Sequence, residues 1–135
     1  MTHSDLRVGN YVFNYYKEIV MIDRVFIDSQ PCGLFPCVGY KHVCSDLGSL
    51  SPVKIDDGWL YRFGFNHREE WKSRLGYTYS KDSCPIKIEY CIVERRYVIH
   101  KSEESIRDGY LIEYVHELQN LYKDIVGEEL KTIDV

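Results

Sequence analysis

The sequence has no long apolar run and no basic segment leading into an apolar one near its first residue, and each absence excludes a class of protein. A membrane-spanning helix needs roughly 20 consecutive apolar residues, and the longest apolar runs here are far shorter. Residues Met1 to Asp5 have none of the features of a secretory signal. We therefore expect a cytosolic protein that does not enter a membrane.

The chain also lacks an excess of basic residues. Its 17 lysines and arginines are outnumbered by 21 aspartates and glutamates, which gives a formal net charge of -4. A protein that holds nucleic acid through bulk electrostatics normally presents a basic surface. An acidic protein can instead dock on a basic partner, such as a protein that itself binds nucleic acid.

The cysteines form no recognisable metal or disulfide framework. There are five of them, an odd number, and no two are spaced as CxxC. A zinc site can be drawn from one region, but its spacings match no standard zinc module. Its ligands would be Cys32, Cys37, His42 and Cys44. We expect free thiols instead, and no metal or other cofactor.

Short motifs of catalysis and phosphate binding are missing as well. No GxSxG elbow positions a nucleophilic serine, and no GxxxxGK[ST] loop cradles a phosphate. His116 and Glu117 resemble half of an HExxH zinc motif but lack the second histidine, so we expect them on a solvent-facing side of a helix. We expect a non-enzymatic protein, with an uncharacterised enzyme as one alternative.

With 135 residues the chain is long enough for a single domain, residues 1–135, with its own core.

The first half of the chain predicts β structure. A turn signal at Gly9 and Asn10 precedes a β-rich run, and Ile19–Ile27 reads as a second strand. Asn14–Glu18 would connect them into a curled hairpin like the start of a small SH3-like barrel. Residues 28–54 are rich in loops, with a short strand at Tyr40–Val43.

The second half predicts two helices around a sheet. A short helix is expected within Ile55–Phe65, capped by Asp56 or Asp57 and ended by Gly64. Period-two alternation then predicts an antiparallel meander. Its strands would be Tyr77–Ser80, Pro85–Glu94, Arg96–His100 and Tyr110–Ile112.

The clearest helical pattern lies near the end of the chain. Apolar residues recur at helical spacing from Tyr114 to Ile125, and Gly127 stands where such a helix ends. Its polar residues Gln119 and Asn120 are expected on a solvent-facing or capping edge. With this helix covering the meander, the fold class is α+β.

Tyrosine is the residue type that points to function. The chain has twelve tyrosines, more than a core of this size needs, and exposed tyrosine clusters are typical of binding surfaces. The candidate partner-binding residues are Tyr15, Tyr16, Tyr77 and Tyr79. The adjacent pair in the predicted hairpin connection is the main candidate. The alternative is that one of these two rings folds back onto the barrel.

A second pattern favours RNA. The segment Arg95–Lys101 mixes cations with an aromatic ring on a predicted hairpin, as base stacking and phosphate contact require. Its candidate contacts are Arg95, Arg96, Tyr97 and Lys101. Acidic residues flank this segment, and no RNP-type or KH-type motif appears. A small RNA-binding accessory protein is therefore an alternative function.

Three segments resemble small uncharacterised proteins of phages and prophages. Leu6–Val12 matches an LRxGNYV pattern, Trp59–Phe65 matches WLxxFGF, and His116–Leu130 matches HxLQNLYxxxxGEEL. They occur in the same order as in those proteins. The resemblance implies origin on a mobile element, and it implies no catalytic or ligand-binding residue.

If the chain is of phage origin, the absence of catalytic motifs favours a binding protein. Small acidic phage proteins of this kind often bind a host protein, and inhibitors of host defence are a prominent class. The resemblance thus implies a binding protein in the host cytosol, such as an anti-CRISPR protein. Its partner would be a CRISPR effector nuclease or the guide-RNA complex of that nuclease.

Overall fold

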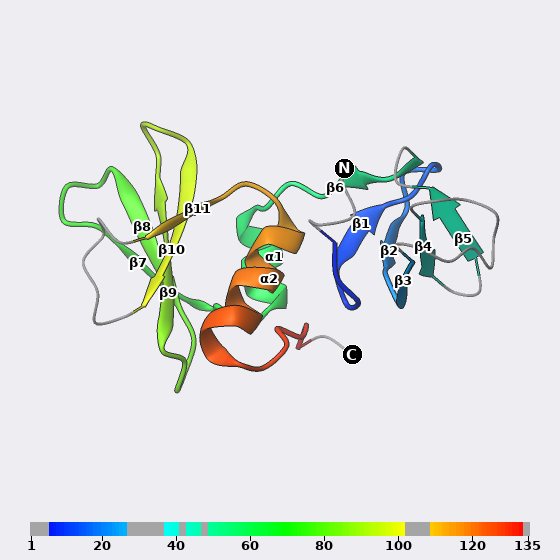
Figure 1. Ribbon diagram of the computed structural model, residues 1–135. Coiled ribbons are helices and arrows are strands. Elements are labelled where there is room, and N and C mark those ends of the chain that lie inside the picture. The colour runs from blue at the N-terminus through cyan, green and yellow to red at the C-terminus, as the bar shows by residue number, and fades with distance from the viewer. Residues whose placement is uncertain (1–5, 27–36, 41–42, 47–48, 102–108, 134–135) are drawn as a thin grey trace. The chain divides into compact units, whose positions relative to one another are not determined.

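The structure, a computed structural model, describes residues 6–26, 37–40, 43–46, 49–101 and 109–133, and it is mixed α+β (Figure 1). This confirms the predicted fold class. The chain divides into two compact units. The first comprises Met1–Lys54 with Tyr114–Asn120, and the second comprises Ile55–Glu113 with Leu121–Val135.

The first unit contains two antiparallel three-stranded sheets, ordered β2-β1-β6 and β3-β4-β5. Their strands are β1 (Tyr11–Phe13), β2 (Ile19–Met21), β3 (Arg24–Phe26), β4 (Cys37–Tyr40), β5 (Val43–Asp46) and β6 (Ser51–Pro52). Strands β1 and β2 form the predicted hairpin, with Val12 opposite Val20. Both of these valines are buried, together with Leu6, Ile22 and Leu50, and they form the core of this unit.

Two strand predictions in this unit were wrong. The segment Ile19–Ile27 is not one strand, because Ile22 and Asp23 separate β2 from β3 and the two strands pair in different sheets. In place of one short strand at Tyr40–Val43, the chain forms the β4–β5 hairpin. Because the β-branched residues follow one another without a break, the sequence does not show where the first strand ends and the second, in another sheet, begins.

The hairpin connection Asn14–Glu18 is confirmed, and the Asn14 side chain organises it. Its Oδ1 accepts hydrogen bonds from the backbone N–H groups of Tyr16 and Glu18, each at 2.9 Å. Lys17 has a φ of 64°, in the left-handed region that tight turns use. These bonds fix the backbone of the turn from the inside.

In the second unit, helix α1 (Asp57–Arg62) forms where the sequence predicts it. Asp56 is its cap, since its Oδ1 accepts a hydrogen bond from the Trp59 N–H at 2.9 Å. Gly64, with a φ of 93°, follows the end of the helix. Trp59 and Phe63 are buried on its inner side.

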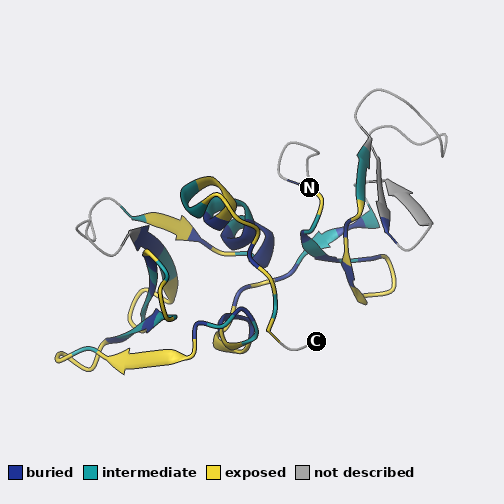
Figure 2. Ribbon diagram, turned by 90° about the horizontal axis from the view of Figure 1, so that it is seen from below, coloured by how far each residue is buried: buried dark blue, intermediate teal, exposed yellow. Residues whose placement is uncertain are grey.

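The predicted meander is a five-stranded antiparallel sheet in the order β11-β10-β9-β8-β7. Its strands are β7 (His67–Glu70), β8 (Gly76–Ser80), β9 (Ile86–Cys91), β10 (Arg96–Lys101) and β11 (Tyr110–Ile112). Strand β7 was not predicted. It is exposed along its whole length (Figure 2), so its charged sequence has no apolar alternation to reveal it. Ile86, Ile88 and Ile99 are fully buried on one face of the sheet.

Helix α2 (Val115–Val126) confirms the predicted C-terminal helix, and Gly127 follows it with a φ of 88°. Tyr122 packs edge-on against Phe65 in the second unit, with ring centroids 6.4 Å apart. In the described part of the chain, neither helix has the length and apolar character needed to cross a membrane.

The polar residues of α2 correct another prediction. Gln119 and His116 are not solvent-facing, since they are only 7% and 5% exposed. Gln119 donates from Nε2 to the Gly9 carbonyl at 2.8 Å and accepts from the Tyr11 N–H at 3.0 Å. Asn120 accepts from Nδ2 of Asn10 at 2.9 Å. The segment Leu6–Val12 and the first part of helix α2 therefore meet in the first unit, where these hydrogen bonds join them.

Candidate protein-binding surface

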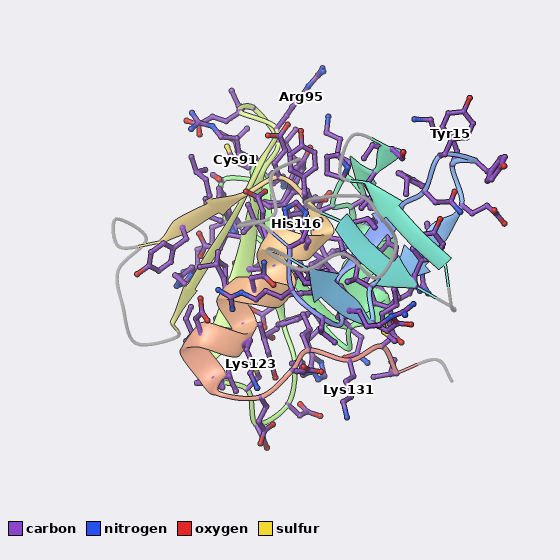
Figure 3. The ribbon with its side chains drawn as sticks, turned by 45° about the vertical axis from the view of Figure 1, so that its right-hand side comes forward. Tyr15, Cys91, Arg95, His116, Lys123 and Lys131 are labelled. Carbon is purple, nitrogen blue, oxygen red and sulfur yellow. The ribbon has the colours of Figure 1, made fainter. Side chains whose placement is uncertain are left out.

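The tip of the β1–β2 hairpin presents two aromatic rings to solvent. Tyr15 is 74% exposed and Tyr16 is 76% exposed, and Tyr15 extends away from the ribbon in Figure 3. Their rings meet edge to face with centroids 5.3 Å apart. Neither ring is buried against the rest of the unit, and packing within the hairpin does not require either of them.

Apolar exposure continues from the tip along strand β2. Ile19 is 44% exposed and Met21 is 50% exposed, and they flank the buried Val20. Because side chains alternate along a strand, Ile19 and Met21 share the outer face of the hairpin. We call Tyr15, Tyr16, Ile19 and Met21 the hairpin surface. Grouped exposed apolar side chains of this kind mark interaction sites more often than isolated ones do.

A second group of tyrosines crosses the five-stranded sheet. Tyr77 and Tyr97 each lie opposite Tyr90 on the neighbouring strand, so the three form one row. The Tyr90 and Tyr97 ring centroids are 4.5 Å apart. All three side chains are half-buried. The structure thus brings together Tyr77, predicted to bind protein, and Tyr97, predicted to contact RNA.

Tyr90, which completes this row, was not among the predicted site residues. It lies on the same face of β9 as Ile86 and Ile88, as the period-two alternation of this segment indicates. Burial strongly raises the pKa of the Tyr97 hydroxyl, and the neighbouring Tyr79 and Tyr90 add to this effect. The row is therefore an aromatic surface on the same face of the sheet as the buried isoleucines.

Tyr79 differs from Tyr77 although both were predicted to bind a partner. Tyr79 is only 2% exposed, so its ring belongs to the core and offers no contact area. Burial raises its pKa, while a hydrogen bond with Arg68 opposes that rise. The guanidinium of Arg68 also lies over the Tyr77 ring, 4.6 Å from its centroid. Arg68 was not predicted, because strand β7 itself was not.

The basic residues predicted to contact RNA lie in different environments in the structure. Arg95 lies in the turn before β10 with a φ of 55° and points into solvent (Figure 3). Arg96 pairs with Glu94 at 3.2 Å, which offsets its charge. Lys101 ends β10, and its side chain lies outside the described part of the structure.

His100 on β10 and Glu89 on β9 form a histidine–carboxylate pair within the sheet. Nε2 of His100 lies 3.3 Å from Oε1 of Glu89, and their side chains are 6% and 13% exposed. Among the described residues, no group of three or more His, Cys, Asp or Glu side chains could hold a metal ion. Cys84 and Cys91 are free thiols. The side chains of the candidate zinc ligands Cys32, Cys37, His42 and Cys44 lie outside the described residues.

Comparison of the chain with models of protein families, with curated proteins and with solved structures gives no match.

Proposed function

We propose that this chain is a non-enzymatic protein of phage or prophage origin that inhibits a host defence effector by protein–protein contact. An RNA-guided CRISPR nuclease is the proposed target. The observation that carries this proposal is the exposure of Tyr15 and Tyr16 at the tip of an ordered hairpin. The resemblance of three segments to phage proteins supports the proposed origin.

Tyrosine suits such a role for physical reasons. Its ring offers a large, rigid contact area with few rotatable bonds, and its hydroxyl can bond to a polar partner. Residues of this type dominate the energetics of many interfaces when they enter pockets on the partner. Here the Asn14 side chain holds the turn that carries both rings, so binding would order few additional groups.

The charge of the chain fits the proposed target. A protein that binds guide RNA and DNA presents basic grooves, and a chain with a net charge of -4 would be attracted to them. Such attraction speeds association and weakens with rising salt. We therefore expect the association rate with the effector to fall as ionic strength increases.

The proposal is tested by titrating the purified chain into target-cleavage assays with a panel of RNA-guided nucleases loaded with guide. We expect cleavage by at least one nuclease to stop near a stoichiometric amount of the chain. The complex should also be seen by size-exclusion chromatography. If no nuclease is inhibited and none forms a complex, the proposed target is wrong.

Direct RNA binding is the competing function, and the row of Tyr77, Tyr90 and Tyr97 is the surface that would serve it. Half-buried rings that pack against one another leave little face for base stacking. We expect no gel shift with random single-stranded RNA at low salt. A shift that Tyr97→Ala removes would replace our proposal with an RNA-binding function.

A further inference from the structure

Strand β2 is an edge strand with one unpaired side. It pairs with β1, and no other strand of the described part pairs with it. The Asn14 N–H donates to the Glu18 carbonyl at 2.9 Å, and the Ile22 N–H donates to the Asn10 carbonyl at 2.8 Å. Glu18 and Ile22 therefore belong to hydrogen-bonded pairs of the β1–β2 ladder, and their backbone groups point towards β1. Because such pairs alternate in an antiparallel ladder, Val20 also faces β1. The N–H and C=O groups of Ile19 and Met21 therefore point away from it.

Two other edges in the described structure are protected in ways that β2 is not. Strand β6 ends in Pro52, which cannot donate a ladder hydrogen bond, and β7 consists of polar and charged residues. Strand β2 contains neither a proline nor a charge. Strand β11 is the other uncharged short edge, and it supplies a matched control below.

We propose that β2 pairs with β2 of a second copy of this chain. The two strands would run antiparallel about a two-fold axis at Val20. In this register Ile19 of each copy lies opposite Met21 of the other, and each such pair exchanges both of its outward backbone hydrogen bonds. Their side chains share the exposed face, so Ile19 packs on Met21 across the axis.

The pairing is limited to the strand itself. Lys17 lies in the turn with a φ of 64°, and the Asp23 carboxylate already binds Arg24, with 2.8 Å between Oδ1 and Nε, so the flanking charges do not set the register. A second copy matches the edge in its outward backbone groups and in its apolar side chains.

This inference goes beyond the proposed function and does not depend on it. Dimerisation needs no host protein. It would use Ile19 and Met21 of the hairpin surface and leave Tyr15 and Tyr16, which lie outside the paired segment, for the target. A dimer would present two hairpin tips to a target.

Sedimentation velocity of the full-length chain over a wide concentration range tests the proposal. We expect a reversible monomer–dimer equilibrium. Met21→Pro removes an outward N–H without touching the bonds to β1, and we expect it to weaken dimerisation about tenfold or more. Circular dichroism checks that this variant folds.

Ile19→Lys is the second variant, and Leu111→Lys is its matched control, because both change an exposed apolar residue on an edge strand. We expect Ile19→Lys to favour the monomer and Leu111→Lys to leave the equilibrium unchanged. A wild-type chain that is monomeric at every concentration overturns the proposal. A dimer that survives Ile19→Lys, or that only Leu111→Lys disrupts, overturns it too.

Discussion

The side-chain amide of Gln119 accepts a hydrogen bond from the backbone N–H of Tyr11 at 3.0 Å, although 108 positions separate the two residues. The same amide donates to the Gly9 carbonyl at 2.8 Å. Helix α2 thus satisfies two backbone groups at the entry to strand β1. These bonds tie helix α2 to the strand that leads into the hairpin, while Tyr15 and Tyr16 at the hairpin tip are exposed.

Replacing Gln119 with alanine should destabilise the protein. The change leaves the Tyr11 N–H and the Gly9 carbonyl without their partner in a partly buried place, which costs about 2 kcal/mol in the free energy of unfolding. Urea denaturation followed by circular dichroism measures this loss. Lys123→Ala, an exposed change on the same helix, serves as the control and should stay within about 0.5 kcal/mol of wild type. Equal stability of the two variants would show that the Gln119 bonds contribute nothing.

Gly127→Ala should lower stability through the backbone alone. Gly127 has a φ of 88°, and a Cβ placed there would meet no atom within 4 Å. Strain of the left-handed conformation therefore accounts for the whole expected loss, about 1 kcal/mol. Asparagine tolerates this conformation better than alanine, so Gly127→Asn should lose less in the same denaturation experiment. The opposite order would contradict this explanation.

Stability should fall in alkaline solution as buried tyrosines ionise. Burial, followed by the neighbouring Cys84, raises the pKa of Tyr122 from 10.0 to about 12. The folded state therefore keeps the proton at a pH where the unfolded state has lost it. Stability is unaffected by this group below pH 10 and declines as the pH rises towards 12.

Tyr122→Phe isolates this contribution. Urea midpoints measured from pH 9 to pH 12 should decline less steeply for the variant than for wild type. The remaining decline reflects Tyr79 and Tyr97, whose pKa values burial also raises. An identical slope in the two proteins would show that Tyr122 ionises equally easily in both states.

Much of the fold could be predicted because the helix-forming patterns and capping residues in the sequence agree with the contacts seen in the structure. Helix α2 follows from its apolar spacing and Gly127, and helix α1 follows from its cap Asp56. Strand β7 could not be predicted, since an exposed polar edge strand owes its existence to pairing with β8. The burial of Gln119 depends on Gly9 and Tyr11, which no local pattern connects to it.

The candidate surface was predictable to a similar degree. Asn14 and the hairpin pattern place Tyr15 and Tyr16 on a turn, and their exposure agrees with that position. Tyr77 and Tyr79 could not be told apart, because residues two apart on a strand share a face. Tertiary packing alone decides that Tyr79 is buried and Tyr77 is half-buried.

The inhibition constant of the double variant Tyr15→Ala/Tyr16→Ala against the inhibited nuclease tests the central claim most directly. Both residues are exposed, so the variant should fold with nearly unchanged stability. We expect its inhibition constant to rise about 100-fold, as the loss of two interface anchors implies. Tyr110→Ala, an exposed tyrosine of the second unit, should inhibit like wild type. A double variant that inhibits as well as wild type would contradict the assignment of the hairpin surface as the contact site.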